Sequence, residues 1–297
     1  MKALLKIFYD RLFRLFVKYR LIRNKNFYVE GRKVLFHRIK DNNLLINISI
    51  NGFESHENEV IKLIKNYHWD LDEFYDIGSN VGHYSSIVSL YHKNTNILAV
   101  EPFPLNANYI RELKANNQFS FEVTEKAVDS VSGLIKKFYF PVSKMSSKLP
   151  GTGTLINSFK GSGGIFNDLP YEEVEVETIS LDDLIGQSSK SSLIKIDCEG
   201  NEFNILNNSK LLDRDNVDFI VEIMINDDDK NDIFNIMKNH NFKGFLITNA
   251  GLVREDRALT LPKPSRNDRT QWRNHFFTKK PLSEIKLFSE THYGYWI

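Results

Sequence analysis

The chain has 297 residues, 41% of them apolar and 12% aromatic, enough to form a sizeable hydrophobic core and to exclude a largely disordered protein. Its single cysteine, Cys198, excludes an internal disulfide framework and indicates a reducing, cytoplasmic location. The net charge is +1, but residues 1–25 hold eight Lys or Arg and one Asp, so the remaining chain has a net charge of −6. Because most of the chain is acidic, we expect no binding to nucleic acid.

Residues 1–23 have the pattern of an amphipathic helix. One helical face carries Leu5, Phe8, Leu12, Leu15 and Phe16. Charges interrupt the apolar residues every three or four positions, so this segment cannot span a bilayer. Two interpretations stay open: a helix lying on anionic lipid at the inner face of the membrane, or a helix packed on its own domain or on a second subunit. The oligomeric state is not determined by the sequence.

We expect residues 1–50 to form this helix and an extension, and residues 51–297 to form the main domain. In that domain β-rich and helical stretches alternate, which favours an α/β structure with a mainly parallel sheet. In chain order, strands are predicted to end at Asp76 and at Glu101 and to span 119–124, 134–140, 172–179, 191–197, 217–222 and 244–248, with helices at 105–117 and 233–240.

The first of these strands runs into the motif Asp-x-Gly-x-Asn-x-Gly, residues 76–82, and then into a helix. Gly78 and Gly82 allow sharp turns and a close approach to a ligand, and the helix presents free N–H groups. A carboxylate at Asp76 would repel a pyrophosphate but suits the cationic amino group of S-adenosylmethionine. The motif therefore favours a methyl donor over NAD.

The second strand, 96–101, ends in Glu101, nineteen residues after Gly82. This is the spacing expected for a carboxylate that binds ribose hydroxyls. The sequence thus predicts a nucleoside-containing cofactor that is bound by residues at the ends of both strands.

The later strand 191–197 delivers Asp197 and Glu199 where the chain turns into a helix. Ligands of open α/β sheets bind beyond the carboxyl ends of the strands, so Asp76, Glu101, Asp197 and Glu222 are expected to converge on one crevice. Such a cluster is costly unless a cation, a shared proton or a ligand offsets the repulsion. The positive charge of the methyl donor could do so, and so could a divalent metal bound by Asp197 and Glu222.

Residues 151–164 contain five glycines in fourteen residues. Such a segment is too flexible for the interior of a helix or strand. It is either a loop at the active site or a surface insertion.

The motifs at 74–84, 100–104, 178–184 and 194–202 together resemble the FkbM-type S-adenosylmethionine-dependent methyltransferases, over about residues 55–250. The resemblance implies a class I methyltransferase fold, which is Rossmann-like, and activity as an O-methyltransferase on hydroxyls of natural products and glycans. It also implies a cofactor site in which Glu101 holds the ribose, Phe103 and Ala127 flank the adenine, and the methionine end is lined by Asp76, Gly78, Ser79, Asn80 and Gly82. Cys198 departs from the family pattern, where a valine is more usual.

Methylation of a hydroxyl requires that its proton be removed. Asp197 and Glu199 are the candidate general bases, with Lys195 and His83 as further catalytic candidates. Alternatively, Glu199 is an acid that stabilises the N-terminus of a helix, and His83 is a solvated residue of a first helical turn.

We expect an O-methyltransferase that uses S-adenosylmethionine and acts on a sugar, glycan or glycolipid. The alternatives are a methyltransferase of a small secondary metabolite and a non-catalytic, cofactor-binding partner of a glycan-modifying enzyme. A NAD-dependent oxidoreductase is disfavoured by Asp76 and by the lack of Gly-x-Gly-x-x-Gly.

Overall fold

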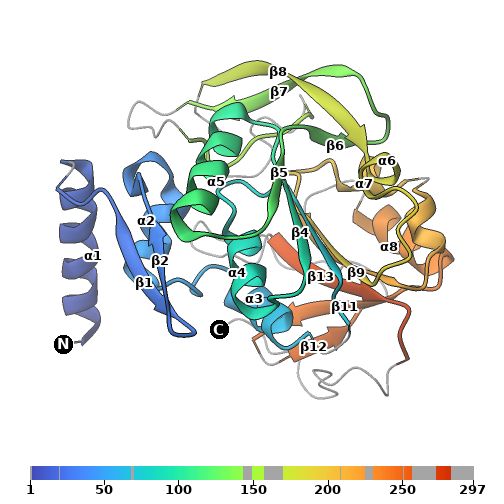
Figure 1. The fold of residues 1–297 in the computed structure, drawn as a ribbon, viewed down its shortest axis with the longest axis horizontal. Coiled ribbons are helices and arrows are strands. Elements are labelled where there is room, and N and C mark those ends of the chain that lie inside the picture. The colour runs from blue at the N-terminus through green and yellow to red at the C-terminus, as the bar shows by residue number, and fades with distance from the viewer. Residues whose placement is uncertain are drawn as a thin grey trace.

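The computed structural model describes residues 2–19, 21–67, 70–142, 149–156, 170–207, 209–224, 230–249, 251–255 and 272–281. Figure 1 shows a twisted central sheet between two layers of helices, a smaller sheet above it, and an N-terminal helix at one side.

Within these residues the central sheet has eight strands in the order β12-β11-β13-β10-β9-β3-β4-β5. Their bounds are β3 Glu73–Ile77, β4 Asn96–Val100, β5 Glu122–Thr124, β9 Ser192–Ile196, β10 Val217–Met224, β11 Lys243–Thr248, β12 Gly251–Arg254 and β13 Trp272–Thr278. Strands β5, β4, β3, β9 and β10 are parallel, and β13 pairs antiparallel with β10 and β11. This is a doubly wound order that reverses between β3 and β9, so the predicted, mainly parallel α/β sheet is confirmed.

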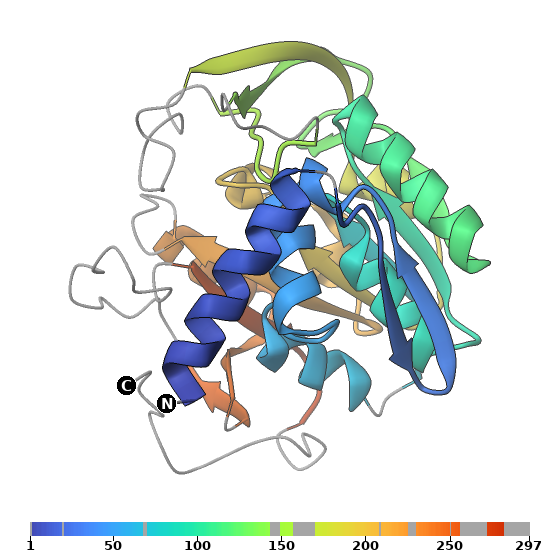
Figure 2. The same cartoon turned by 90° about the vertical axis from the view of Figure 1, so that its left-hand side faces the viewer.

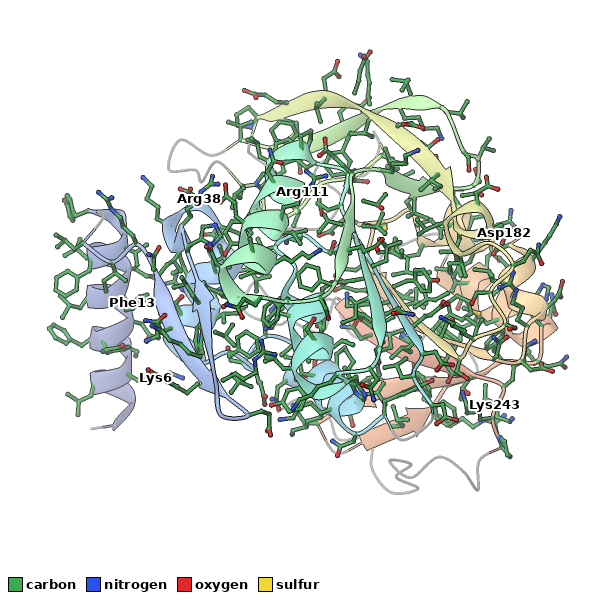
Figure 3. The ribbon with its side chains drawn as sticks, viewed as in Figure 1. Lys6, Phe13, Arg38, Arg111, Asp182 and Lys243 are labelled. Atoms are coloured by element: carbon green, nitrogen blue, oxygen red, sulfur yellow. The ribbon has the colours of Figure 1, made fainter. Side chains whose placement is uncertain are left out.

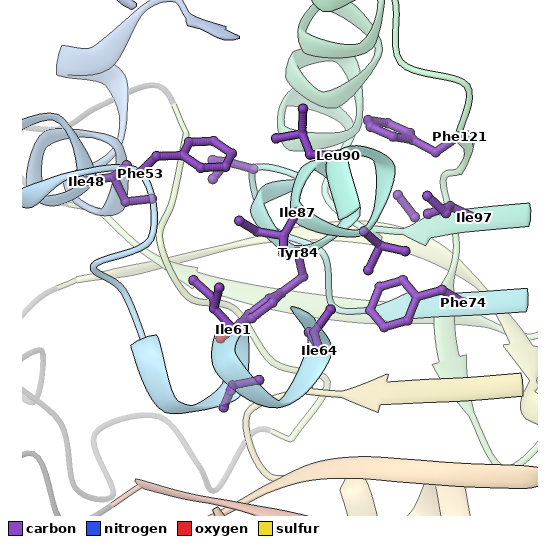
Figure 4. Close-up of a cluster of buried hydrophobic side chains, with 14 of the residues drawn as sticks. Ile48, Phe53, Ile61, Ile64, Phe74, Tyr84, Ile87, Leu90, Ile97 and Phe121 are labelled. Carbon is purple, nitrogen blue, oxygen red and sulfur yellow. The ribbon is translucent and has the colours of Figure 1, made fainter. Parts of the chain in front are cut away.

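Alternate side chains of each central strand enter the two helical layers. In β3, Phe74 joins the core under one layer, and Tyr75 and Ile77 join the core under the other. The first layer comprises α3 Asn58–Lys65, α4 His83–Tyr91 and α5 Pro104–Asn117; the second comprises α6 Leu181–Ile185, α7 Glu202–Leu206, the short helix η3 Lys210–Asp213 and α8 Lys230–Asn239. Figure 4 shows the first core, where Phe74, Ile97 and Phe121 face Ile61, Ile64, Ile87 and Leu90.

The smaller sheet has the strand order β6-β8-β7. Its strands are β6 Ala127–Asp129, β7 Ile135–Pro141 and β8 Tyr171–Ser180. Strand β6 runs parallel to β8, and β7 pairs antiparallel with it, so the side chains of β6 and β7 are held over the end of the main sheet.

The N-terminal region is built on the main domain. It consists of α1 Lys2–Lys18, the hairpin β1 Lys25–Val29 and β2 Arg32–Phe36, the short helix η1 Ile39–Asp41 and α2 Asn43–Asn51. Asn117 at the end of α5 bonds the backbone N–H and carbonyl of Leu35. The rings of Phe27 and Phe36 pack on Phe53 at 5.5 Å between centroids. Residues 27–48 share one hydrophobic core with the sheet, so residue 50 does not divide two cores.

Asn42 connects this region to the loops at the end of the sheet. It is fully buried, and its Oδ1 accepts hydrogen bonds from Leu44 N (2.7 Å) and Leu45 N (3.3 Å), which caps α2. Its Nδ2 donates to Asn80 Oδ1 (3.3 Å) and to Pro150 O (3.4 Å). One side chain thus supports a helix and two loops.

We predict that Asn42→Ala lowers the free energy of unfolding by about 1–2 kcal/mol, because a helix cap is lost and buried polar groups lose a partner. Urea unfolding followed by circular dichroism would measure the change. Asn51→Ala is the matched control, since Asn51 is exposed and bonds only within α2, to Asn47 O. Equal effects of the two substitutions would contradict the assigned role of Asn42.

Candidate functional site

A pocket of about 680 Å³, open solvent at its mouth included, lies where β3, β4 and β9 end. The walls come from the loop after β3, the end of β4, the smaller sheet, the segment 150–155 and the loop after β9. The pocket therefore lies beside the reversal of strand order, where ligands of doubly wound sheets bind.

Gly78 brings the loops after β3 and β9 into contact. Its φ is +79°, and a Cβ at this position would lie 1.9 Å from the carbonyl oxygen of Asp197. No larger residue fits without moving one of the loops. Gly82, with φ +71°, has a different role, since its Cβ would meet Ile110 of α5 at 3.1 Å. Gly78 lines the pocket as expected, whereas Gly82 allows α4 and α5 to pack closely.

Glu101 ends β4 at the pocket wall, as the spacing predicts. Its Oε2 accepts a hydrogen bond from Asn80 N (2.8 Å), and its Oε1 accepts one from Phe103 N (2.9 Å). Burial raises the pKa of Glu101 to about 8, although these two backbone donors favour the charged form. The carboxyl group thus fixes the loop after β3 against the start of α5.

The segment 150–155 closes one side of the pocket and is the beginning of the glycine-rich stretch. Asn80 Nδ2 donates to Gly151 O (2.8 Å), and Thr154 Oγ1 donates to the carbonyl oxygen of Glu199 (2.9 Å). This part of the stretch therefore lies at the site and links the loops after β3 and β9. Residues 157–169 lie outside the described structure.

Asp76 is placed differently from our expectation. Its Oδ2 accepts hydrogen bonds from the N–H (3.0 Å) and the hydroxyl (2.7 Å) of Ser85, so it supports the first turns of α4. Burial raises its pKa, and the charge of Lys195 opposes this shift. Asp76 does not line the pocket, because its position in β3 directs the side chain to the face that α4 covers. It therefore stabilises the loop after β3 without facing the pocket.

Of three other residues expected at the cofactor, one lines the pocket and two are buried behind its wall. Ala127 lines the pocket. Phe103 is buried behind the wall, with its ring centroid 4.6 Å from that of Phe140 and 6.5 Å from that of Phe138. Phe138 is the aromatic residue at the surface of the pocket. Ser79 is buried and off the wall, and its Oγ has no hydrogen-bond partner within the described part of the chain.

His83 lies in the core, neither solvated nor at the pocket. Its Nε2 is 2.7 Å from Phe53 O, and its ring meets that of Phe53 edge-on at 5.3 Å. Burial, reinforced by the nearby His56, lowers the pKa of His83 to about 3. The first turn of α4 is covered by the segment after α2, so His83 is removed from our set of catalytic candidates.

Lys195 is the centre of an acidic cluster beneath the pocket. Its side chain is 2% exposed, its Nζ lies 2.8 Å from Asp197 Oδ2, and it lies 4.6 Å from the centroid of the Tyr84 ring. Burial by itself lowers the pKa of Lys195, but the charges of Asp197, Glu57 and Glu222 outweigh burial and raise it. Lys195 is therefore a fixed cation and does not act as a base.

Asp197 and Glu222 share a hydrogen bond within this cluster. Burial and the charge of Asp197 raise the pKa of Glu222 well above its ordinary value. Burial also opposes the charge on Asp197, but Lys195 and the proton donated by Glu222 outweigh it and lower the pKa of Asp197. These opposite shifts favour a proton on Glu222 and a charge on Asp197. Asp197 stays ionised, lines the pocket and has a side chain that is 26% exposed.

Glu57 belongs to the same cluster but was not found by sequence reasoning. It precedes α3 with φ 45° and accepts a hydrogen bond from the Tyr84 hydroxyl. No motif surrounds it, and its charge contributes to the raised pKa values of Lys195 and Glu222. Asn42, Asn106 and Phe138 were likewise missed, because they reach the pocket region from other parts of the fold.

The cluster does not fit a metal site. Nowhere in the described residues do three or more His, Cys, Asp or Glu side chains gather as metal ligands would. The ammonium group of Lys195 already lies against Asp197, where the expected metal would bind. The positive charge that offsets these carboxylates is thus part of the chain, and our expectation of a metal at Asp197 and Glu222 is not supported.

Glu199 and Glu202 have separate roles. Glu202 accepts hydrogen bonds from Cys198 N (2.7 Å) and Gly200 N (2.9 Å), so it orders the turn before α7. Glu199, with φ 50°, lines the pocket and is partly exposed. Burial and the charge of Asp197 raise the pKa of Glu199 to about 8. Glu101 also lines the pocket with a pKa raised to about 8, but both of its carboxyl oxygens accept backbone hydrogen bonds, so Glu199 is the better candidate to accept a proton near neutral pH.

Comparison with known proteins agrees with the resemblance in the sequence. A family model, described as the methyltransferase FkbM domain, matches residues 76–243, more than half of the chain. The 31-O-demethyl-FK506 methyltransferase FkbM of Streptomyces tacrolimicus is 25% identical over 151 residues, which cover 46% of this chain and 58% of that protein. The match thus spans less than two thirds of that relative.

Solved structures with a similar arrangement include two bacterial methyltransferases. A precorrin-6y C5,15-methyltransferase from Geobacter metallireducens is 14% identical, with a TM-score of 0.38, over 75% of this chain and 88% of that chain. A TehB-like SAM-dependent methyltransferase from Corynebacterium glutamicum is 10% identical, with a TM-score of 0.36, over 75% of this chain and 88% of that chain.

We predict that Gly78→Ala disrupts the pocket, because its Cβ would overlap the carbonyl oxygen of Asp197. The stability should fall by roughly 1–3 kcal/mol. The dissociation constant of S-adenosylhomocysteine should rise roughly tenfold or more. Calorimetric titration and thermal unfolding would measure the two effects. Gly151→Ala is the matched control, since Gly151 also lines the pocket but has nothing within 4 Å of an added Cβ. Unchanged binding by Gly78→Ala would refute the assigned contact.

Proposed function

The chain belongs to the FkbM family of S-adenosylmethionine-dependent methyltransferases, and on this premise we propose that it methylates a hydroxyl oxygen of a sugar, glycan or glycolipid. The observation that carries the proposal is the pairing, at one pocket wall, of an ionised Asp197 with a Glu199 whose pKa is raised to about 8. The name of the Streptomyces relative describes a methyltransferase of 31-O-demethyl-FK506, which agrees with an oxygen acceptor.

The pocket suits the methyl donor chemically. Glu101 can accept hydrogen bonds from ribose hydroxyls, and the apolar surface of Ala127, Val128 and Phe138 can pack on an adenine. Asn80 and the ionised Asp197 lie at the end formed by the loops after β3 and β9, where they favour a cationic amino acid end. The bound donor supplies a methyl group that is already activated by its positive sulfur.

The remaining task of the protein is to orient an acceptor oxygen and to take its proton. A group with a pKa near the working pH is an efficient general base. Asp197 is held ionised by Lys195 and is a weak base, so it is suited to accepting a hydrogen bond that orients the acceptor. We assign the transfer of the proton to Glu199.

A polyhydroxylated acceptor fits the acidic character of this region. Asp197 and Glu199 both line the pocket. Carboxylates accept hydrogen bonds from hydroxyl groups, and two neighbouring hydroxyls of a sugar can donate to both of them at once. A small secondary metabolite with one free hydroxyl is the second candidate, supported by the name of the curated relative.

The proposal is tested by incubating the protein with isotope-labelled S-adenosylmethionine and a panel of oligosaccharides, glycolipids and hydroxylated macrolides. Mass spectrometry and NMR would locate a new O-methyl group. Methylation of a sugar hydroxyl supports the proposal, and methylation of macrolides alone supports the second candidate. Methylation of nitrogen, or binding of the cofactor with no transfer to any acceptor, would refute both; the second result would favour a non-catalytic binding protein.

We predict that Glu199→Gln lowers kcat by roughly 10²–10⁴-fold, because an amide cannot take the proton. In the wild type, kcat/KM should rise as the pH approaches 8 and level off above it, since the base acts in its deprotonated form. The variant should lose this dependence but still bind S-adenosylhomocysteine. Glu122→Gln, at an exposed position of β5, is the control and should behave as the wild type. An unchanged pH profile in Glu199→Gln would exclude Glu199 as the base.

A further inference from the structure

Within the described residues, helix α1 contacts the rest of the chain through the side that carries Phe13 and Val17. Phe13 and Val17 are buried on that side, and Lys25 Nζ lies 5.9 Å from the centroid of the Phe13 ring. Arg14 donates a hydrogen bond of 2.7 Å to Asn47 Oδ1 of α2. Figure 2 shows α1 along the outside of the molecule, and Figure 3 marks Phe13 and Lys6 on it. The opposite side of α1 is therefore open to what surrounds the molecule.

That open side is apolar. Its large side chains are Leu5 (63% exposed), Phe8 (66%), Tyr9 (51%), Leu15 (45%), Phe16 (38%) and Tyr19 (65%). At 100° per residue these side chains cover about one third of the helix circumference. Single exposed apolar residues are ordinary, but a continuous strip of this kind marks an interaction surface. It is also the face that the sequence pattern identifies, so the predicted apolar face of α1 does not pack on the described part of this chain.

Positive charge borders one edge of the strip. On the helical wheel Arg11 lies at that edge and is exposed, whereas Lys6, also exposed, lies between Phe13 and Val17 on the packed side. The one acidic residue of α1, Asp10, lies on the packed side and is partly buried. An apolar face bordered by positive charge is the pattern of helices that lie in the interface of an anionic membrane.

We propose that the face of α1 formed by residues 5–19 docks on an anionic lipid surface, with its apolar strip among the headgroups and its cations against lipid phosphates. Pairing of this face with a second copy is less suited to these charges, because it would bring two basic borders together. Among the described helices none is both long and apolar enough to cross a bilayer, so α1 would lie on the surface. The proposal depends on α1 alone and is independent of the acceptor.

Sedimentation of the full chain with vesicles tests this proposal. We expect binding to phosphatidylcholine vesicles that contain phosphatidylglycerol, loss of binding at high salt, and weak binding to phosphatidylcholine alone. Phe8→Glu should reduce the partition coefficient roughly tenfold. Arg11→Gln should reduce it roughly fivefold. Ile135→Glu is the matched control, because Ile135 is 63% exposed but lies on β7, and it should bind as the wild type.

Light scattering without vesicles provides the second measurement. The proposal predicts the same mass for the wild type and Phe8→Glu, and circular dichroism should show the same helix content. Equal vesicle binding by the wild type and Phe8→Glu would overturn the proposal, as would equal binding to charged and neutral vesicles. A dimer that Phe8→Glu dissociates, without vesicle binding by the wild type, would assign the face to self-association instead.

Discussion

The buried ammonium group of Lys195 is the charge on which the site depends. Carboxyl groups from the residue before α3, from β10 and from the loop after β9 converge on it, and without a cation their burial would be strongly unfavourable. The charge of Lys195 lowers the pKa of Asp197 and favours its ionised form. Burial and the charge of Asp197 raise the pKa of Glu222 and favour its protonated form. Because Lys195 belongs to β9, next to β3 at the reversal of strand order, this charge lies directly beneath the pocket.

Close contacts between loops fix the geometry of the pocket above this charge. Gly78 allows the loops after β3 and β9 to touch, and Glu101 ties the first of them to α5. Asn42 and the segment 150–155 extend this network to the N-terminal region. The N-terminal region is therefore a structural part of the site, although its strands and helices lie outside the central sheet.

The pocket and helix α1 carry opposite charges. The pocket is acidic, which suits a cationic methyl donor. Helix α1 is basic and carries an apolar strip, which suits an anionic surface. The net charge of the whole chain is close to zero because the acidic and basic regions balance, so it does not reveal either region.

The sequence by itself determined the sheet and the placement of Glu101 and Asp197 at one of its edges, because alternation identifies strands and the carboxyl ends of parallel strands share one edge. Only the tertiary structure decided what lies around them. Asp76 and His83 belong to recognisable motifs, yet Asp76 turns toward Ser85 of α4 and His83 turns toward Phe53 after α2. Glu57 carries no local signal and acquires its role from contact with Tyr84. Periodicity along a chain shows which face of a helix or strand is apolar, but only packing decides which neighbour covers that face, as the open side of α1 illustrates.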